Sequence, residues 1–360
     1  MSWVVVFLGL MMLIILHEFG HFAAAKAVGM RVERFSLFFP PLLLRKKVGE
    51  TEYAIGTLPL GGYVKISGMS PAEDLPDEVR TRAYHAQPVW KRIVVISAGP
   101  AMNLLIAFVV LFIFYTAIGP HGPTNRVGTI EKGYPASGAL KLGDRLVSVD
   151  GKRGSLDTLS RQIATHKCAK QPPVKGCKAT TSAEIVVKRN GRLVHLTLTP
   201  IYDPGTHKTR LGFGFDDNGP RLTLGVGDAL SASADQFWYI TKETATLPAR
   251  LLNSQQRKQI SGVVGVSDVA HQTVANDPGL AVFLLAVVSL SLAIVNLFPF
   301  LPLDGGHIFW AVVELFRRRP VPFSVMERSG VVGFMLVIMI FLIGFTNDIS
   351  RLTNGGFKVK

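Results

Sequence analysis

Residues 2–30 of the chain read SWVVVFLGLMMLIILHEFGHFAAAKAVGM. A helix needs about 20 mostly apolar residues to cross a lipid bilayer, so this run predicts a transmembrane helix at residues 1–30. A signal peptide would begin with a basic segment and stay apolar throughout. This run lacks such a segment and carries His17, Glu18 and His21. We therefore expect the span to be retained, with polar groups that need partners inside the membrane.

Three further apolar stretches predict membrane spans. They lie at residues 93–119, within residues 280–316 and at residues 331–347, and the last is the shortest. Hydrophobic residues make up 48% of the chain, and its mean hydropathy is positive, which is unusual for a single soluble globule. The sequence therefore predicts a polytopic α-helical membrane protein with about four transmembrane helices.

The basic residues predict the orientation of these spans. They crowd the loops at residues 31–92 and 317–330, and loops rich in lysine and arginine stay on the cytoplasmic side. The N-terminus, residues 120–279 and the tail at residues 348–360 are then expected outside the cytoplasm. The net charge of +14 does not predict a nucleic-acid partner, because the basic residues are scattered over loops and are not interleaved with aromatic residues.

The first cytoplasmic loop contains a β-pattern. Residues 31–69 alternate short apolar runs with turn signals, as in TEYAIGTLPLGGYVKISGM, which is typical of strands. We expect β-hairpins that lie against the lipid bilayer. A free hairpin edge can take up an added strand, and the hairpin at residues 52–69 could hold an unwound peptide at Tyr63 and Val64. Residues 71–88 are polar and acidic, which predicts an exposed excursion.

Residues 120–204 resemble a PDZ domain, an α+β fold. The segment YPASGALKLGDRLVSVDG at residues 134–151 is close to the PDZ pattern SPAxxAGLxxGDxIxxxxG, and its Asp-Gly at residues 150–151 is typical of a hairpin turn. The resemblance implies a module that binds a peptide or a regulator. The alternative is a steric plug that limits what reaches the membrane. Residues 205–279 are expected to form a linker and amphipathic helices at the outer surface.

Cys168 and Cys177 are the two cysteines of the chain. Both fall in the outer segment, where an oxidising compartment permits a disulfide. The sequence leaves open whether they pair or remain thiols.

The first span carries the motif His17-Glu18-x-x-His21. Residues four apart lie on one face of a helix about one turn apart, so the two histidines can hold one cation and Glu18 can take a proton from water. One alternative is a chance occurrence, and another is a polar patch that packs against a neighbouring helix. Because such groups are costly in a membrane unless they are paired, the pattern favours a metal site.

A catalytic zinc site needs a third protein ligand and an open position. The best candidate is Asp304, within NLFPFLPLDGGH at residues 296–307. Pro299 and Pro302 prevent a regular helix there, and the two glycines after Asp304 permit unusual backbone angles, so the carboxylate can turn into a cavity. The alternative is an ordinary aspartate that caps a helix.

Taken together, HEFGH in the first span, the PDZ-like insert and NLFPFLPLDGG in the third resemble the site-2 protease family of intramembrane zinc metalloproteases. The sequences GGYVK and GPAMN extend the resemblance over nearly the whole chain, and the bacterial RseP-type branch is the most similar. The departure is a single PDZ-like module, where two are typical of that branch. The resemblance implies that His17, His21 and Asp304 bind Zn²⁺, that Glu18 activates water, and that Asn296 contacts the substrate backbone. His307 matches no ligand position.

The resemblance also implies the partners and the location. The substrates of such a protease would be single-span membrane proteins, such as anti-sigma factors or remnant signal peptides. The protease would lie in a bacterial inner membrane, with its active site toward the cytoplasm. A different class of function is a membrane scaffold whose PDZ-like module binds peptides, and such a scaffold needs no zinc. A metal-dependent transporter is a third possibility, but the sequence shows no evident internal repeat.

Overall fold

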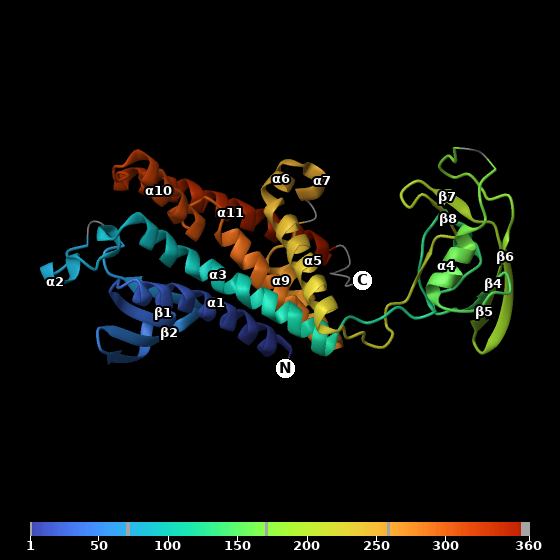
Figure 1. Cartoon of the computed structure of the whole chain (residues 1–360), viewed down its shortest axis with the longest axis horizontal. Helices are drawn as coiled ribbons and strands as arrows, with labels where there is room; N and C mark the ends of the chain where they lie inside the picture. The colour runs from blue at the N-terminus through green and yellow to red at the C-terminus, as the bar shows by residue number, and fades with distance from the viewer. Residues whose placement is uncertain (1, 70–72, 170–171, 258–259, 354–360) are drawn as a thin grey trace. The chain divides into compact units, whose positions relative to one another are not determined.

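The computed structural model describes residues 2–69, 73–169, 172–257 and 260–353. The chain divides into two compact units. The first unit comprises Met1–Ile118 and Leu224–Lys360, and the second is the intervening Gly119–Thr223 (Figure 1). An independent module is thus inserted into a chain that otherwise forms one helical body.

Four helices of the first unit are long and apolar enough to cross a membrane, which agrees with the prediction of four spans. The fourth is longer than the apolar run at residues 331–347, because its helix continues through polar residues at both ends. These helices are α1 (Ser2–Ala27), α3 (Val89–Ile113, continued by a π-helical turn at Phe114–Ile118), α9 (Pro278–Asn296) and α11 (Phe323–Thr353).

Helix α3 lies between α1 and α9 and packs against both (Figure 1). Small residues permit the close approach on the α1 side, since a Cβ atom at Gly20 would lie 2.4 Å from the carbonyl oxygen of Ala98. On the α9 side the hydroxyl of Ser289 donates a 2.9 Å hydrogen bond to the backbone carbonyl of Asn103. The first contact fixes α3 relative to α1, which carries the HExxH motif, and the second joins α3 to α9.

The stretch at residues 280–316, expected to hold the third span and the motif at Asp304, consists of two helices. Helix α9 ends at Asn296, and α10 (Asp304–Arg317) begins after a non-helical segment. Pro299 and Pro302 lack the N–H group that a continuing helix requires. Glycine at position 305 packs directly on this segment, because a Cβ atom there would lie 2.2 Å from the Leu297 carbonyl oxygen. The interruption leaves Asp304 as the first residue of α10.

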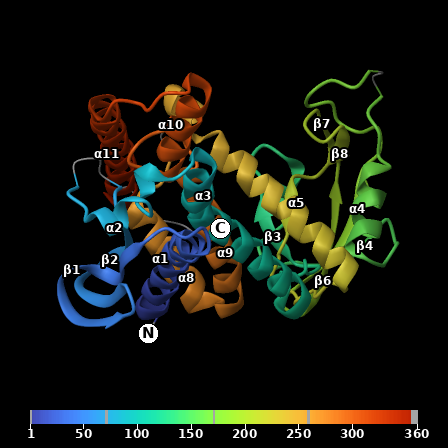
Figure 2. The ribbon, with the colours of Figure 1, turned by 60° about the vertical axis from the view of Figure 1, so that its left-hand side comes forward.

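The predicted β-region consists of β1 (Val32–Val48) and β2 (Thr51–Ile66), which lie beside α1 (Figure 2). The two strands fold back on themselves, so that Phe35 pairs with both Tyr53 and Val64. Among the described residues, residues 62–66 pair only with residues 32–37, and their other side forms an edge of the folded sheet. This edge approaches the motif of α1, because a Cβ atom at Gly62 would lie 3.3 Å from Cγ of Glu18.

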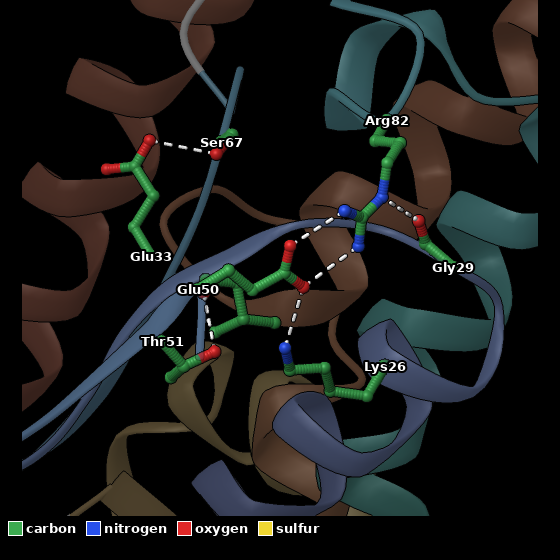
Figure 3. A network of polar contacts seen from close by, with 8 residues as sticks. Lys26, Gly29, Glu33, Glu50, Thr51, Ser67 and Arg82 are labelled. Carbon is green, nitrogen blue, oxygen red and sulfur yellow. Dashed lines mark hydrogen bonds and ion pairs between the residues drawn. The ribbon is translucent and has the colours of Figure 1, made fainter. Parts of the chain in front are cut away.

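A polar network attaches the β-region to α1 (Figure 3). Arg82 donates two hydrogen bonds to the Glu50 carboxylate, at 2.7 and 2.8 Å, and Lys26 donates a third at 2.8 Å. The hydrogen bonds from Arg82 have the largest effect, and together with the one from Lys26 they lower the pKa of the Glu50 carboxyl to about 2. Glu50 is therefore ionised at neutral pH, and the turn between β1 and β2 is held at the C-terminal end of α1.

The expectation of an exposed excursion at residues 71–88 is wrong for its second half. Ala83 and Tyr84 are buried, and the Tyr84 N–H donates to the Ser67 carbonyl at 2.8 Å. Apolar side chains in this polar segment pack on the end of β2, which composition alone did not reveal. The segment contains α2 (Asp77–Arg80) and a 3₁₀ turn at Tyr84–Ala86, and residues 70–72 lie outside the described residues.

The second unit has its own core of apolar side chains from its sheet and α4, including Leu146, Leu159 and Ile185. A disulfide joins Cys168 to Cys177, whose Cα atoms are 6.0 Å apart. The unit extends beyond the expected module at residues 120–204, because the strands at Lys208–Arg210 and Phe213–Phe215 fall in the stretch expected to be a linker. Its elements are β3 (Val127–Ile130), a 3₁₀ turn (Pro135–Gly138), β4 (Arg145–Val149), α4 (Leu156–Ala164), β5 (Ala183–Arg189), β6 (Arg192–Leu198), β7 (Ile201–Asp203), β8 (Lys208–Arg210) and β9 (Phe213–Phe215).

Within this unit β4, β5 and β6 form one sheet, while β3 pairs with β9 and β7 with β8. The identification of the unit as a PDZ domain stays a prediction. Helices follow it, as expected for residues 205–279. They are α5 (Val226–Ala245), which packs on α3 and α9 (Figure 2), α6 (Leu247–Leu252), α7 (Ser254–Arg257) and α8 (Val263–Asn276).

Candidate metal centre

Three predicted ligands from two helices meet at one point. His17 and His21 project from one face of α1, and Asp304 begins α10. The Oδ2 atom of Asp304 lies 3.2 Å from Nε2 of His17 and 3.4 Å from Nε2 of His21, and the two Nε2 atoms are 3.3 Å apart. Both histidines are buried. The structure thus brings together residues that are more than 280 positions apart in the sequence.

The spacing of these atoms fits a tetrahedral zinc ion. Zinc bonds to histidine nitrogen and carboxylate oxygen of about 2.0–2.1 Å set neighbouring ligands about 3.3 Å apart. The three measured distances are 3.2, 3.3 and 3.4 Å. Two histidines and one carboxylate are also a donor set typical of catalytic zinc, with a fourth position left for substrate or water.

The hydrogen bonding around the cluster supports a cation as well. The Nδ1 atom of His21 lies 2.9 Å from the Val95 carbonyl oxygen, which can only accept, so the neutral ring carries its proton on Nδ1 and turns a lone pair at Nε2 toward the cluster. Asp304 Oδ2 is buried without a hydrogen-bond partner among the described residues. Acceptors that face one another in a buried site repel unless a cation lies between them.

A glycine makes room for the second histidine. A Cβ atom at Gly99 of α3 would lie 2.2 Å from Nε2 of His21 and 2.6 Å from its Cε1. The imidazole therefore rests directly on the backbone of α3. The sequence analysis quoted GPAMN, which begins with Gly99, only as part of the family resemblance and did not assign Gly99 to the site.

The cluster opens into a cavity of about 320 Å³. Glu18 lines it between the two histidines of α1, and its carboxylate receives a backbone hydrogen bond from Val64 of the sheet edge. Asn296 at the end of α9 and His307 of α10 line the same cavity. The site thus holds a metal-binding set, one free carboxylate and an adjoining strand edge.

Most of the predicted site residues line the cavity, but Tyr63 does not. Val64 and Asn296 line the cavity together with Glu18 and the three ligands. Tyr63 does not, because successive side chains of a strand point to opposite faces. Its phenol oxygen accepts a 3.1 Å hydrogen bond from Arg34, and its ring stacks on Phe39. The residues that the sequence did not single out are apolar ones such as Ile14, Met69 and Leu292, whose types carry no chemical signal.

Comparison with known proteins gives a consistent result. A model of peptidase family M50 matches residues 5–340. The chain is 32% identical over 401 residues to the zinc metalloprotease Rip1 of Mycobacterium tuberculosis, covering 95% of each chain. It is 28% identical over 384 residues to the metalloprotease MmpA of Caulobacter vibrioides, covering 95% of this chain and 94% of that one. The matched region includes both helices that supply the ligands.

Proposed function

The chain belongs to peptidase family M50, the site-2 protease family, and from this premise we propose that it hydrolyses peptide bonds within the transmembrane segments of single-span membrane proteins. The family and the relatives establish a zinc metalloendopeptidase. The observation that carries the step to intramembrane cleavage is the position of the ligands. His17, Glu18 and His21 lie within a helix that is apolar and long enough to cross a membrane, so a substrate must meet them there.

The residues of the cavity divide the chemistry among them. His17, His21 and Asp304 hold zinc, which when bound supplies Lewis acidity toward water and the substrate carbonyl. Glu18 accepts the proton of the attacking water on its carboxylate and passes it to the nitrogen of the leaving amine. Asn296 lies on the same wall and offers an amide to the substrate backbone. The catalytic base is therefore placed beside the ligands by a single helical turn.

The edge of the β-region is suited to hold the substrate. A membrane helix has its peptide groups hydrogen-bonded internally, so a segment must unwind before it is cut. Residues 62–66 have one side unpaired in the sheet, and Val64 lines the cavity. An unwound segment can pair with this edge as an added strand and lie extended beside Glu18.

Replacing Val64 by proline tests this pairing. Proline removes the backbone N–H of that position, which also contacts Glu18. Loss of the added strand should raise KM for a single-span substrate about tenfold or more, the scale of one lost hydrogen bond in a dry site, whereas loss of the Glu18 contact alone should lower kcat. The matched control is Arg45→Pro in the opposite part of the folded sheet, with zinc content measured on both variants. Unchanged cleavage by a zinc-loaded Val64→Pro protein would refute the added strand.

A second cavity gives the substrate space beyond the metal. It has a volume of about 530 Å³ and shares Met69, Pro302 and His307 with the first, so the two adjoin. Its other walls come from the start of α3, α10 and α11, and they include the ion pair of Arg92 with Glu314. A chain held at the sheet edge can therefore continue past the cluster without meeting closed packing.

The decisive experiment is cleavage of model single-span substrates by the full-length protein in liposomes. One substrate carries an all-leucine span and the other carries a Gly-Pro pair at mid-span, and mass spectrometry locates the cut. We expect the cut inside the span, and faster cleavage of the helix-broken substrate, because less unwinding is required. Cleavage confined to soluble loops would leave a zinc peptidase but would refute intramembrane proteolysis.

The location and partners belong to the same proposal. We place the protein in a bacterial inner membrane, with the second unit in the periplasm and the metal site toward the cytoplasm. The basic loops at residues 31–92 and 317–330 support this orientation. Anti-sigma factors and remnant signal peptides are the proposed substrate classes, and the second unit would bind a peptide or a regulator.

A further inference from the structure

Asn103 is a polar residue without an assigned role at the centre of a membrane span. It lies in α3 and is fully buried. Its side-chain Nδ2 atom is 3.3 Å from Nδ1 of His17, and its Oδ1 atom is buried with no hydrogen-bond partner in the described part of the chain. An unpaired amide at such a depth is costly, so these contacts call for an explanation.

The metal-binding tautomer of His17 determines whether the oxygen or the nitrogen of the Asn103 amide must face its Nδ1 atom. Nε2 of His17 faces Asp304 and His21, so a bound cation requires a lone pair on Nε2 and places the proton of the neutral ring on Nδ1. A group that faces Nδ1–H must accept. The nitrogen of the Asn103 amide, as oriented, matches only the opposite tautomer, in which Nε2 carries the proton and cannot bind a metal.

A half-turn of the amide resolves this mismatch. The oxygen and nitrogen of an asparagine side chain have nearly the same shape, and their assignment follows from the hydrogen-bond network. Rotation about the last side-chain bond puts Oδ1 where Nδ2 now lies, within 3.3 Å of His17 Nδ1. The rotated amide accepts the Nδ1 proton and leaves Nε2 free for the ion.

The other histidine of the cluster is held in the same way. His21 Nδ1 lies 2.9 Å from the backbone carbonyl of Val95, which is also in α3. One helix would thus supply the acceptor for both rings, from its backbone in one case and from a side chain in the other. Hydrogen bonds of this kind fix the tautomer and ring orientation of metal-binding histidines.

Packing does not account for the choice of asparagine. The remaining polar contact of Asn103 is the hydrogen bond that its backbone carbonyl accepts from Ser289, and any residue would offer that carbonyl. We propose that Asn103 is a positioning residue, whose side-chain oxygen accepts a hydrogen bond from Nδ1–H of His17 and so holds that ring in its zinc-binding form. The inference rests on the zinc site and not on the nature of the substrate.

The test measures zinc affinity of the purified full-length protein in detergent, by competition with a chelator of known affinity. Asn103→Leu keeps the branching of the side chain but is larger and offers no acceptor, and we expect its zinc affinity to fall about 10–100-fold. Asn103→Asp keeps an oxygen at the same place, and we expect it to retain the wild-type affinity. Ser289→Ala removes only the neighbouring hydrogen bond to the Asn103 backbone and should leave zinc affinity unchanged.

Three outcomes would overturn the proposal. They are wild-type zinc affinity in Asn103→Leu, equal losses in the Asp and Leu variants, and an equal loss in Ser289→Ala. Thermal unfolding of the metal-free proteins shows whether a variant is merely misfolded. Should Asn103→Leu fail to fold, nitrogen NMR of the zinc-loaded wild type decides, since the proposal requires the His17 proton on Nδ1. A proton on Nε2 would refute it without any variant.

Discussion

Replacing Glu18 by glutamine is expected to lower kcat/KM for peptide cleavage by about 10²–10⁴-fold, while zinc remains bound. Glutamine has nearly the same shape as glutamate but cannot accept a proton from water. The three metal-binding atoms belong to His17, His21 and Asp304, and Glu18 is not among them. The substitution therefore separates proton transfer from metal binding.

The measurement pairs cleavage of a single-span substrate in liposomes with the zinc content of each protein. Asp304→Ala is the matched comparison, since it removes a ligand from the same cavity and should lose both zinc and cleavage. If Glu18→Gln lost its zinc, Glu18 would have to act as a ligand. If it still cut at a substantial fraction of the wild-type rate, another group would have to serve as the base.

The elements of this site that were predicted from the sequence are those with a local signature. His17 and His21 are four residues apart in one helix, a spacing that fixes their common face whatever surrounds them. Asp304 follows two prolines and precedes two glycines, and those residue types interrupt a helix by their own backbone chemistry. The structure contains that interruption and places the carboxylate 3.2 Å from His17. The four spans were equally readable from their length and apolar composition.

Features that depend on contacts distant in sequence were not predicted. Phe35 pairs with two different parts of β2, and no pattern within residues 31–69 specifies such a fold-back. Tyr63 and Val64 were proposed together, but the register of β2 turns only Val64 to the cavity. Asn103 ends the GPAMN sequence of the second span, but its neighbour His17 became visible only once α1 and α3 were packed together.

Substituting alanine for Gly99 is expected to abolish zinc binding and to lower cleavage by about 10²-fold or more, the cost of a misplacement of about 1 Å at a catalytic group. In a helix interior, alanine is more stable than glycine by up to about 1 kcal/mol, so the backbone of α3 should not suffer. The added Cβ atom would, however, lie 2.2 Å from Nε2 of His21, far inside the contact distance. The ring must then leave the position in which it faces Asp304 and His17.

Gly227→Ala is the matched control for this experiment. It makes the same substitution in the first turn of α5, where a Cβ atom would meet nothing within 4 Å, so zinc content and cleavage should be unchanged. Loss of zinc in Gly99→Ala alone, with thermal unfolding near that of the control, would show that the close approach of α3 to His21 is a condition for the metal site. A Gly99→Ala protein that kept its zinc and its rate would mean that His21 can bind the metal from another rotamer. In that case the tight packing of α1 on α3 would serve the fold and not the chemistry.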